Sequence, residues 1–390
     1  MRISHLPLAA LLAFTLTFIG CDQSSESPET NNATPTPSAS PTQSPTNGTA
    51  KTEPKPAAPK KDEYDTGEEK VLNVLAWSGY VPETILEKFE KQTGIEVNLE
   101  TFESNEEMRQ KLLSGDGSYD LIQPSEYVVE SFIAEDLLRP IDHTAVSNVK
   151  NIAPEFRSLP FDPDNQYSVP WMAGTVGIIK NNELAPDPVT SFAEVFSGKY
   201  DGQIVVLDDP REIVSWALES LDLPINDLSE ENLAQAKAVL DEWLPQVKLY
   251  DSASPKTALH EGNAAVGIVW NGEAAILLNQ DPDKYTWALP EEGSHLFVDS
   301  LAIPKSATHP KNAELFMNFI LRPNISQLIS AEFPYLNPNA AAREALGPEA
   351  LSNPASYPSD TELSRLQVFE KVDPPTSKAV EDLVTTIKIQ

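Results

Sequence analysis

From residue 71 onward, the sequence alternates short apolar runs with amphipathic stretches of helical period. Strands are expected at residues 71–76, 95–101 and 119–122, and helices at 82–92, at 104–113 and from Tyr127. The second of these helices opens with Ser-Asn-Glu-Glu at 104–107, a capping-box pattern. Units of about 25 residues in the order β, α, β, α favour a mainly parallel sheet with helices on both faces, which is an α/β fold.

The same alternation continues through the second half of the chain. Strands are expected at residues 176–179, 203–207, 264–269 and 301–303, and helices at 210–221, 233–243 and 312–321. Neither a GxGxxG fingerprint nor a P-loop motif occurs, so nucleotide binding has no support in the sequence. There is also no GxSxG motif of serine hydrolases.

Charge and cysteine content exclude several classes of function. With 28 Lys and Arg against 59 Asp and Glu, the net charge of −31 disfavours nucleic acid, whose phosphates require clustered basic residues. A single cysteine excludes an internal disulfide or a cysteine zinc cluster, and the five histidines include no i, i+4 pair. We therefore expect no metal and no cofactor. The acidity suits a cationic ligand or simple solubility, and composition does not choose between them.

The N-terminal segment has the pattern of an export signal. Arg2 precedes an apolar run at 6–19 that is too short to span a bilayer. The run ends in Phe-Ile-Gly-Cys at 18–21, which resembles the bacterial lipoprotein cleavage box, although Phe18 replaces the usual leucine. The resemblance implies that the signal comprises residues 1–20, that it is removed, and that Cys21 is lipidated. The alternative is an ordinary signal followed by an incidental cysteine.

Residues 21–70 differ abruptly in composition from the rest of the chain. The stretch after Cys21 is rich in Pro, Ser, Thr and Asn and contains no Leu, Ile, Val or Phe. Because it lacks apolar side chains to bury, it cannot offset the entropy lost on ordering. We expect residues 21–70 to be a disordered tether that holds the folded body away from a membrane surface.

Aromatic and acidic residues recur where the expected strands end. In parallel α/β sheets, ligands bind beyond the carboxyl ends of the strands. Aromatic faces attract cations, and carboxylates neutralise ammonium groups and accept their hydrogen bonds. The pattern therefore favours a site for an organic cation with an apolar stem. The segments are Trp77–Tyr80, Ser125–Tyr127, Asp209–Glu212, Trp270–Glu273 and Phe297–Asp299.

These segments, in this order, resemble the polyamine-binding proteins of bacterial ABC importers. The resemblance covers about 320 residues and includes residues 77–82, 102–106, 119–125, 209–212, 270–272, 299–304 and 321–323. It implies a two-lobed type II periplasmic-binding-protein fold, in which each lobe is a mainly parallel sheet flanked by helices. The implied lobes are 71–175 with 298–343, and 176–297 with 344–390.

The resemblance also implies the residues that contact the ligand. Asp299 corresponds to the acid that binds one amino end, and Trp270 to the central stacking aromatic. The full implied set is Trp77, Ser78, Tyr80, Ser125, Tyr127, Asp209, Glu212, Trp270, Glu273, Phe297, Asp299, Tyr335 and Gln367. Each has a structural alternative: the aromatics could be core, Ser125 a helix cap, Asp209 and Glu212 acids at a helix N-terminus, and Asp299 a solvated surface acid.

Two positions bear on ligand choice. Phe297 stands where spermidine receptors have tryptophan and putrescine receptors have phenylalanine, and Glu273 stands where putrescine receptors have aspartate. The segment Asp209–Glu212 is closer to the spermidine type. The choice between a diamine and a triamine stays open.

The implied activity is capture rather than catalysis. Two lobes would close around the ligand, and a monomeric, extracytoplasmic receptor would then dock on an ABC permease. Two alternatives remain. One is a receptor of the same fold for an iron complex, a sugar or an amino-acid derivative. The other is a secreted enzyme that uses paired carboxylates, although the sequence contains no recognisable combination of a nucleophile and a base.

Overall fold

The computed structural model describes residues 64–114 and 118–389. The expected signal peptide 1–20, the lipidation residue Cys21 and the tether up to residue 63 lie outside the described residues. Among those that are described, no helix combines the length and the apolar character needed to cross a bilayer.

The first half of the described chain has the expected alternation of strands and helices. Its elements are β1 (Val71–Trp77), α1 (Glu83–Thr93), β2 (Glu96–Phe102), α2 (Asn105–Ser114), β3 (Leu121–Ile122) and α3 (Glu126–Ala134). Strand β1 pairs in parallel with both β2 and β3, as predicted. The predicted capping box of α2 forms in part: the hydroxyl of Ser104 accepts the Glu107 N–H, but the Glu107 carboxylate accepts from Glu103.

The second half contributes another set of parallel strands with helices around them. Its elements are β5 (Ile204–Val206), α5 (Pro210–Ser220), α6 (Glu230–Trp243), β6 (Val247–Tyr250), β7 (Val266–Trp270) and α8 (Asn271–Gln280). Strand β5 pairs in parallel with β6 and with β7. The sequence did not predict β6, whose short run is only partly buried or exposed.

Two long strands connect these two sets. They are β4 (Ser168–Asn181), which is buried along its whole length, and β9 (Ser294–Ala302). The two strands pair antiparallel, with Gly174 opposite Phe297, and the sheet has the order β2-β1-β3-β9-β4-β7-β5-β6. The predicted strands 176–179 and 301–303 therefore overlap only the C-terminal parts of longer strands. Strand β4 continues through Gly174, where an aromatic ring packs against the bare backbone.

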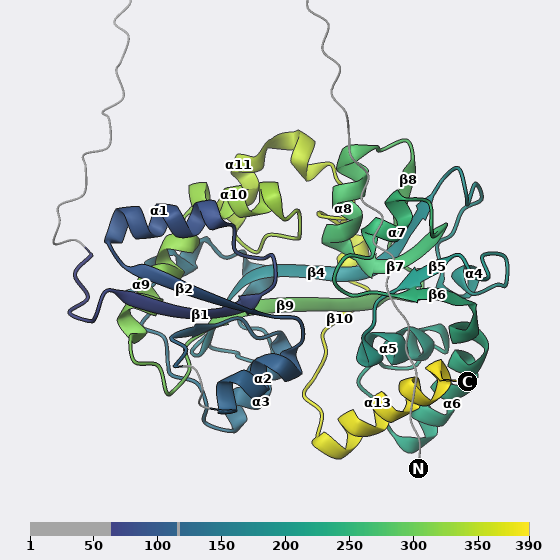
Figure 1. Cartoon of the computed structure of the whole chain (residues 1–390), viewed down its shortest axis with the longest axis horizontal. Helices are drawn as coiled ribbons and strands as arrows, with labels where there is room; N and C mark the ends of the chain where they lie inside the picture. Colours follow the sequence, from purple (N-terminus) through teal and green to yellow (C-terminus); the bar gives the residue numbers. More distant parts are fainter. Residues whose placement is uncertain (1–63, 115–117, 390) are drawn as a thin grey trace, which may run out of the picture. The chain divides into compact units, whose positions relative to one another are not determined.

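The remaining elements cover the sheet or connect it. They are η1 (Ser147–Asn151), η2 (Pro154–Phe156), α4 (Phe192–Val195), η3 (Leu244–Gln246), α7 (Lys256–His260), β8 (Tyr285–Ala288), α9 (Pro310–Ile320), α10 (Pro323–Glu332), α11 (Ala340–Leu351), α12 (Asp360–Leu363), β10 (Leu366–Gln367) and α13 (Pro374–Lys388). Helix α13 packs on α5 and α6 (Figure 1).

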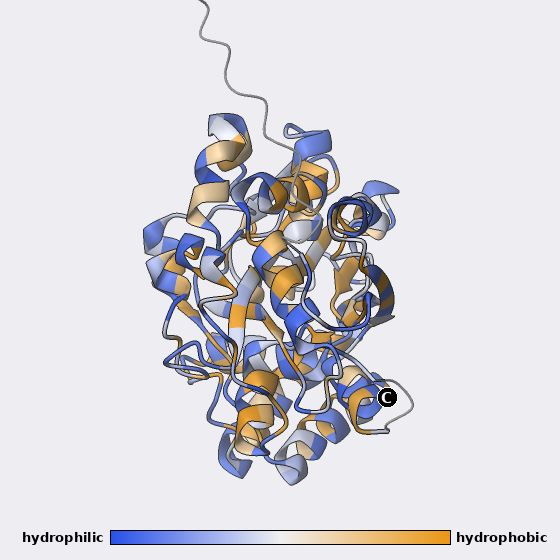
Figure 2. Ribbon diagram, turned by 90° about the vertical axis from the view of Figure 1, so that its left-hand side faces the viewer, coloured by the Kyte–Doolittle hydropathy of each residue, from blue (hydrophilic) through white to orange (hydrophobic). Residues whose placement is uncertain are grey.

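Separate hydrophobic clusters lie on either side of the β4–β9 connection. One cluster contains Phe89, Phe316 and Val298, and a second contains Trp216, Phe192 and Val384. Many helices carry both hydrophobic and hydrophilic residues, as helices with one buried face do (Figure 2). The fold is thus two α/β groups that share the strands β4 and β9 (Figure 1).

The last residues of the predicted tether, 64–70, are not a free segment. The Glu68 carboxylate accepts hydrogen bonds from the backbone N–H groups of Lys311 (3.2 Å) and Asn312 (2.9 Å) in the first turn of α9. The buried amide of Asn312 donates to the carbonyls of Glu69 and Val71. Although the segment lacks apolar side chains, it is held because it satisfies polar groups at a helix N-terminus. The prediction of disorder was wrong for these residues.

The contact between Glu68 and the first turn of α9 should contribute to the stability of the folded chain. Replacing Glu68 with alanine removes the acceptor for two N–H groups of α9, and should lower the free energy of unfolding by about 1 kcal/mol, as the loss of a helix cap does. Urea denaturation measures this difference. The neighbouring Glu69→Ala is the matched control, because the Glu69 side chain is exposed and should contribute nothing. Equal effects of the two changes would contradict the capping role.

Candidate ligand site at the β4–β9 connection

Five aromatic residues from distant parts of the sequence meet near the β4–β9 connection. Ring centroids are 6.3 Å apart between Trp77 and Tyr80, and 5.5 Å between Tyr80 and Tyr335. Phe297 of β9 lies 5.9 Å from Tyr335 and 5.4 Å from Trp270, which ends β7. All the predicted aromatics except Tyr127 are thus brought together, from β1 and the turn after it, from β7 and β9, and from the loop after α10. We call these five residues the aromatic cluster.

Asp299 lies on β9, two residues beyond Phe297 on the same face of the strand. Its side chain is buried, and its Oδ1 accepts a hydrogen bond from the Ser125 hydroxyl at 2.7 Å. Burial raises the pKa of Asp299 to about 7, against the opposing effect of the Ser125 hydrogen bond. The structure therefore does not support the alternative of a solvated surface acid.

Two glycines let aromatic rings approach bare backbone. A Cβ atom on Gly174 would lie 2.3 Å from the Phe297 ring, and one on Gly272 would lie 2.5 Å from the Tyr335 ring. Gly272 is at the start of α8, whereas Tyr335 belongs to the cluster on the other side of the β4–β9 connection. At both positions the missing Cβ is what lets a ring of the aromatic cluster lie against the backbone.

The other predicted acids already have partners. Both carboxylate oxygens of Glu273 accept from the Lys256 ammonium, at 2.8 and 2.7 Å. Asp209 is the N-cap of α5 and accepts hydrogen bonds from the backbone N–H groups of Arg211 and Glu212. This is the helix-capping role that was the structural alternative for this residue. Glu212 is buried and lies 2.6 Å from Nδ1 of His295. Asp299, in contrast, has no ion pair among the described residues.

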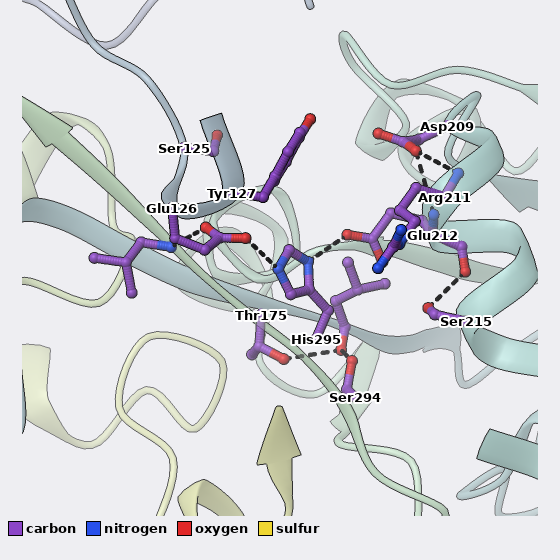
Figure 3. A network of polar contacts seen from close by, with 12 residues as sticks. Ser125, Glu126, Tyr127, Thr175, Asp209, Arg211, Glu212, Ser215, Ser294 and His295 are labelled. Carbon is purple, nitrogen blue, oxygen red and sulfur yellow. Dashed lines mark hydrogen bonds and ion pairs between the residues drawn. The ribbon is translucent and has the colours of Figure 1, made fainter. Parts of the chain in front are cut away.

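His295 occupies a position that sequence reasoning did not identify. Its Nδ1 faces Glu212 of α5, and its Nε2 lies 3.0 Å from Glu126 at the start of α3 (Figure 3). Burial alone would lower the pKa of His295, but the carboxylates of Glu212 and Glu126 raise it to about 10. A neutral imidazole can donate from only one nitrogen, so the imidazolium is the form that satisfies both carboxylates. These three residues are referred to below as the histidine triad.

Phe369 is a second residue that the sequence reasoning missed. The His295 ring stacks on Phe369, with centroids 3.7 Å apart, and the Arg211 guanidinium lies 4.6 Å from the same ring. Gln367 lies next to this stack, because β10 pairs with β9 at Gln367 and His295. No motif in the sequence marks Phe369, since its role depends on a pairing 74 residues away along the chain.

A cavity of about 610 Å³ opens beside the histidine triad. It lies between α2 and α3 on one side and α5 and α13 on the other, and Tyr127, Asp209, Arg211 and Phe369 are among its lining residues. The aromatic cluster does not line this cavity. Tyr127 joins the two regions through Asn105, whose amide donates to the Tyr127 hydroxyl and to Ser125 Oγ, both at 3.0 Å.

Two further observations complete the site. Ser78 follows β1 with an exposed side chain, and its N–H donates to the Phe102 carbonyl, so it is not brought together with the aromatic cluster. Within residues 64–114 and 118–389, no three His, Cys, Asp or Glu side chains are grouped so that they could hold a metal ion. The chemistry that the site offers is therefore a buried carboxylate beside aromatic faces.

Comparison with known proteins gives consistent results. The family model for "Bacterial extracellular solute-binding protein" matches residues 84–359. The "Spermidine/putrescine-binding periplasmic protein" of Salmonella typhimurium is 36% identical over 292 residues, covering 74% of this chain and 83% of that protein. A putrescine-binding periplasmic protein of Escherichia coli is 28% identical, covering 82% of this chain and 92% of the relative.

Solved structures agree with the fold assignment. A structure described as a putative spermidine/putrescine ABC transporter from Listeria monocytogenes superposes with a TM-score of 0.78 at 34% identity, covering 82% of this chain and 99% of the other. A lipoprotein of Treponema pallidum gives a TM-score of 0.73 at 28% identity, with coverages of 82% and 100%. The two-lobed fold predicted from the sequence is thereby confirmed. The chain belongs to the family of bacterial extracellular solute-binding proteins.

Proposed function

We propose that this chain is an extracytoplasmic receptor that captures a polyamine between its two lobes and delivers it to the permease of an ABC importer. The observation that carries the proposal is Asp299, a buried carboxylate that has no ion pair in the described part of the chain and lies beside the aromatic cluster. A buried carboxylate without a cation is costly, and a ligand ammonium would supply the missing partner. The names of the relatives support the same ligand class.

The two parts of the site suit the two parts of a polyamine. The ammonium would bind the Asp299 carboxylate, since charge-assisted hydrogen bonds are the strongest that such a group can accept. The methylene chain would lie against the faces of Trp77, Trp270 and Phe297, which offer apolar area and attract the adjacent positive charge. Tyr80 and Tyr335 would close the cluster around it. No nucleophile is needed for this role, so we infer binding rather than turnover.

Closure of the lobes would bury the ligand. The pairing of residues 173–175 with 296–298 in β4 and β9 is the connection about which the lobes would move. We propose lobes 71–175 with 298–343 and 176–297 with 344–390. We further propose that the receptor acts as a monomer, and that a lipid on Cys21 anchors it to a membrane through the segment after that residue.

Calorimetry with putrescine, cadaverine, spermidine and agmatine tests the ligand class. We expect at least one of them to bind with one molecule per chain. Because the ligand binds only folded protein, a hundredfold excess over Kd should also raise the free energy of unfolding by about 2.7 kcal/mol. Butane-1,4-diol is the control ligand, since it keeps the chain of putrescine without its charges and should not bind. No binding by any of the four amines would overturn the proposal.

A further inference from the structure

One face of β9 presents three side chains in a row. His295, Phe297 and Asp299 alternate with residues that point to the other face, because successive side chains of a strand lie on opposite faces. The His295 and Phe297 ring centroids are 6.3 Å apart. The row therefore runs from a carboxylate without a cation, past an aromatic ring, to a side chain that is itself a cation.

The cation at the end of the row is held from both lobes. Glu126 belongs to α3, on the side of β1 and β3, and Glu212 belongs to α5, on the side of β5 and β7. All three members of the histidine triad are buried, and the Glu126 carboxylate also accepts the Val298 N–H at 2.9 Å. His295 stacks on Phe369, and the Arg211 guanidinium over the same ring places a second positive charge at this end.

We propose that His295 determines specificity, because its imidazolium takes the place of a ligand ammonium at the Glu126 and Glu212 carboxylates and so favours short diamines over longer polyamines. This inference rests on the proposed polyamine-binding function. Two cations of the protein already lie at these two carboxylates: the His295 imidazolium contacts both of them, and the Arg211 guanidinium lies over the Phe369 ring on which His295 stacks. A ligand that brings another ammonium to this end would therefore meet two like charges.

The lengths of putrescine and spermidine agree with this proposal. His295 and Asp299 are four steps apart along β9, so their Cα atoms are about 13 Å apart at the usual rise of about 3.3 Å per residue. With ordinary single-bond lengths, the terminal nitrogens of an extended putrescine are about 6 Å apart and those of spermidine about 11 Å apart. A diamine with one nitrogen on Asp299 therefore ends beside the aromatic rings of Phe297 and Trp270. The far nitrogen of a triamine reaches the neighbourhood of His295.

The test is the ratio of spermidine affinity to putrescine affinity, measured by calorimetry near neutral pH. The unaltered protein should bind putrescine more tightly than spermidine. His295→Gln removes the charge but keeps hydrogen-bonding capacity, and should raise the ratio at least about tenfold, the lower end of the coupling between close charge pairs. His295→Lys restores a cation and should keep the original preference. If His295 had only a general structural role, His295→Gln would weaken the binding of both ligands equally and leave the ratio of their affinities unchanged.

His309→Gln is the matched control, because His309 also pairs with a buried carboxylate, Asp120 at 3.0 Å, but belongs to the start of α9. The ratio of spermidine affinity to putrescine affinity in His309→Gln should equal that of the unaltered protein. Tighter binding of spermidine than putrescine by the unaltered protein would overturn the inference without any variant, and so would an unchanged ratio in folded His295→Gln. Both outcomes leave polyamine binding intact, whereas failure to bind any polyamine overturns the proposed function and this inference with it.

Discussion

Replacing Asp299 with alanine is expected to weaken the binding of a polyamine about thirtyfold or more. Asp299 is a buried acid with no ion pair among the described residues, and a carboxylate that accepts the Ser125 hydroxyl can accept further hydrogen bonds from a charged donor. Removing one partner of a buried, hydrogen-bonded charge pair costs about 2–5 kcal/mol, since the other charge stays buried and unpaired. Calorimetry on the variant and the unaltered protein measures the difference directly.

The same residue should make binding depend on pH. Burial raises the pKa of Asp299 to about 7, so the ligand-free protein holds a proton there below neutrality. An ammonium requires the carboxylate, and affinity should therefore fall as the pH drops below about 7, by up to about tenfold per unit. Asp299→Asn should bind weakly at every pH and lose this dependence.

Unfolding of the Asp299 variants would not explain their weaker binding. The folded-state pKa of Asp299 lies above the unfolded value of about 3.9, so the folded protein binds more protons between the two and becomes less stable as the pH rises through that window. Above about pH 7, removing the carboxylate should leave stability unchanged or improve it. Asp164→Ala is the control: it removes one exposed acid and should change neither the affinity for the polyamine nor the stability of the fold. Full affinity in Asp299→Ala would remove this residue from the site.

Local patterns in the sequence were enough to predict the strand–helix order and most of the aromatic cluster. The reason is that parallel strands bring their carboxyl ends to one edge, so Trp77 and Trp270 could be placed together without knowing any contact. The same argument holds for Ser125, at the start of the helix after β3, whose hydroxyl meets Asp299 in the structure.

Contacts between residues far apart in the chain could not be predicted in this way. Glu212 was expected to face an ammonium group, and the positive group that it faces is His295, 83 residues away. Similarly, Glu68 looks like part of a charged tether, and only the structure shows its contact with the first turn of α9. Neither partner belongs to a local pattern, because each pairing depends on how the whole sheet is assembled.

Gly272→Ala should weaken polyamine binding about tenfold while leaving the fold at least as stable. Position 272 lies in the first turn of α8, where alanine is favoured over glycine by up to about 1 kcal/mol. A Cβ there would lie 2.5 Å from the Tyr335 ring, on the other side of the β4–β9 connection. The methyl group would thus oppose closure of the lobes on the ligand, and overpacking of this kind costs about 1–3 kcal/mol.

Gly177→Ala separates this effect from simple crowding. Its Cβ would lie 2.4 Å from the Trp287 ring, but β4 and β8 pair here within one side of the structure. The clash is therefore present whether the lobes are open or closed, and it should lower the free energy of unfolding with little change in affinity. Thermal melting and calorimetry on both variants distinguish the two. If Gly272→Ala lost stability and kept its affinity, Tyr335 and α8 would not form a contact made on closure.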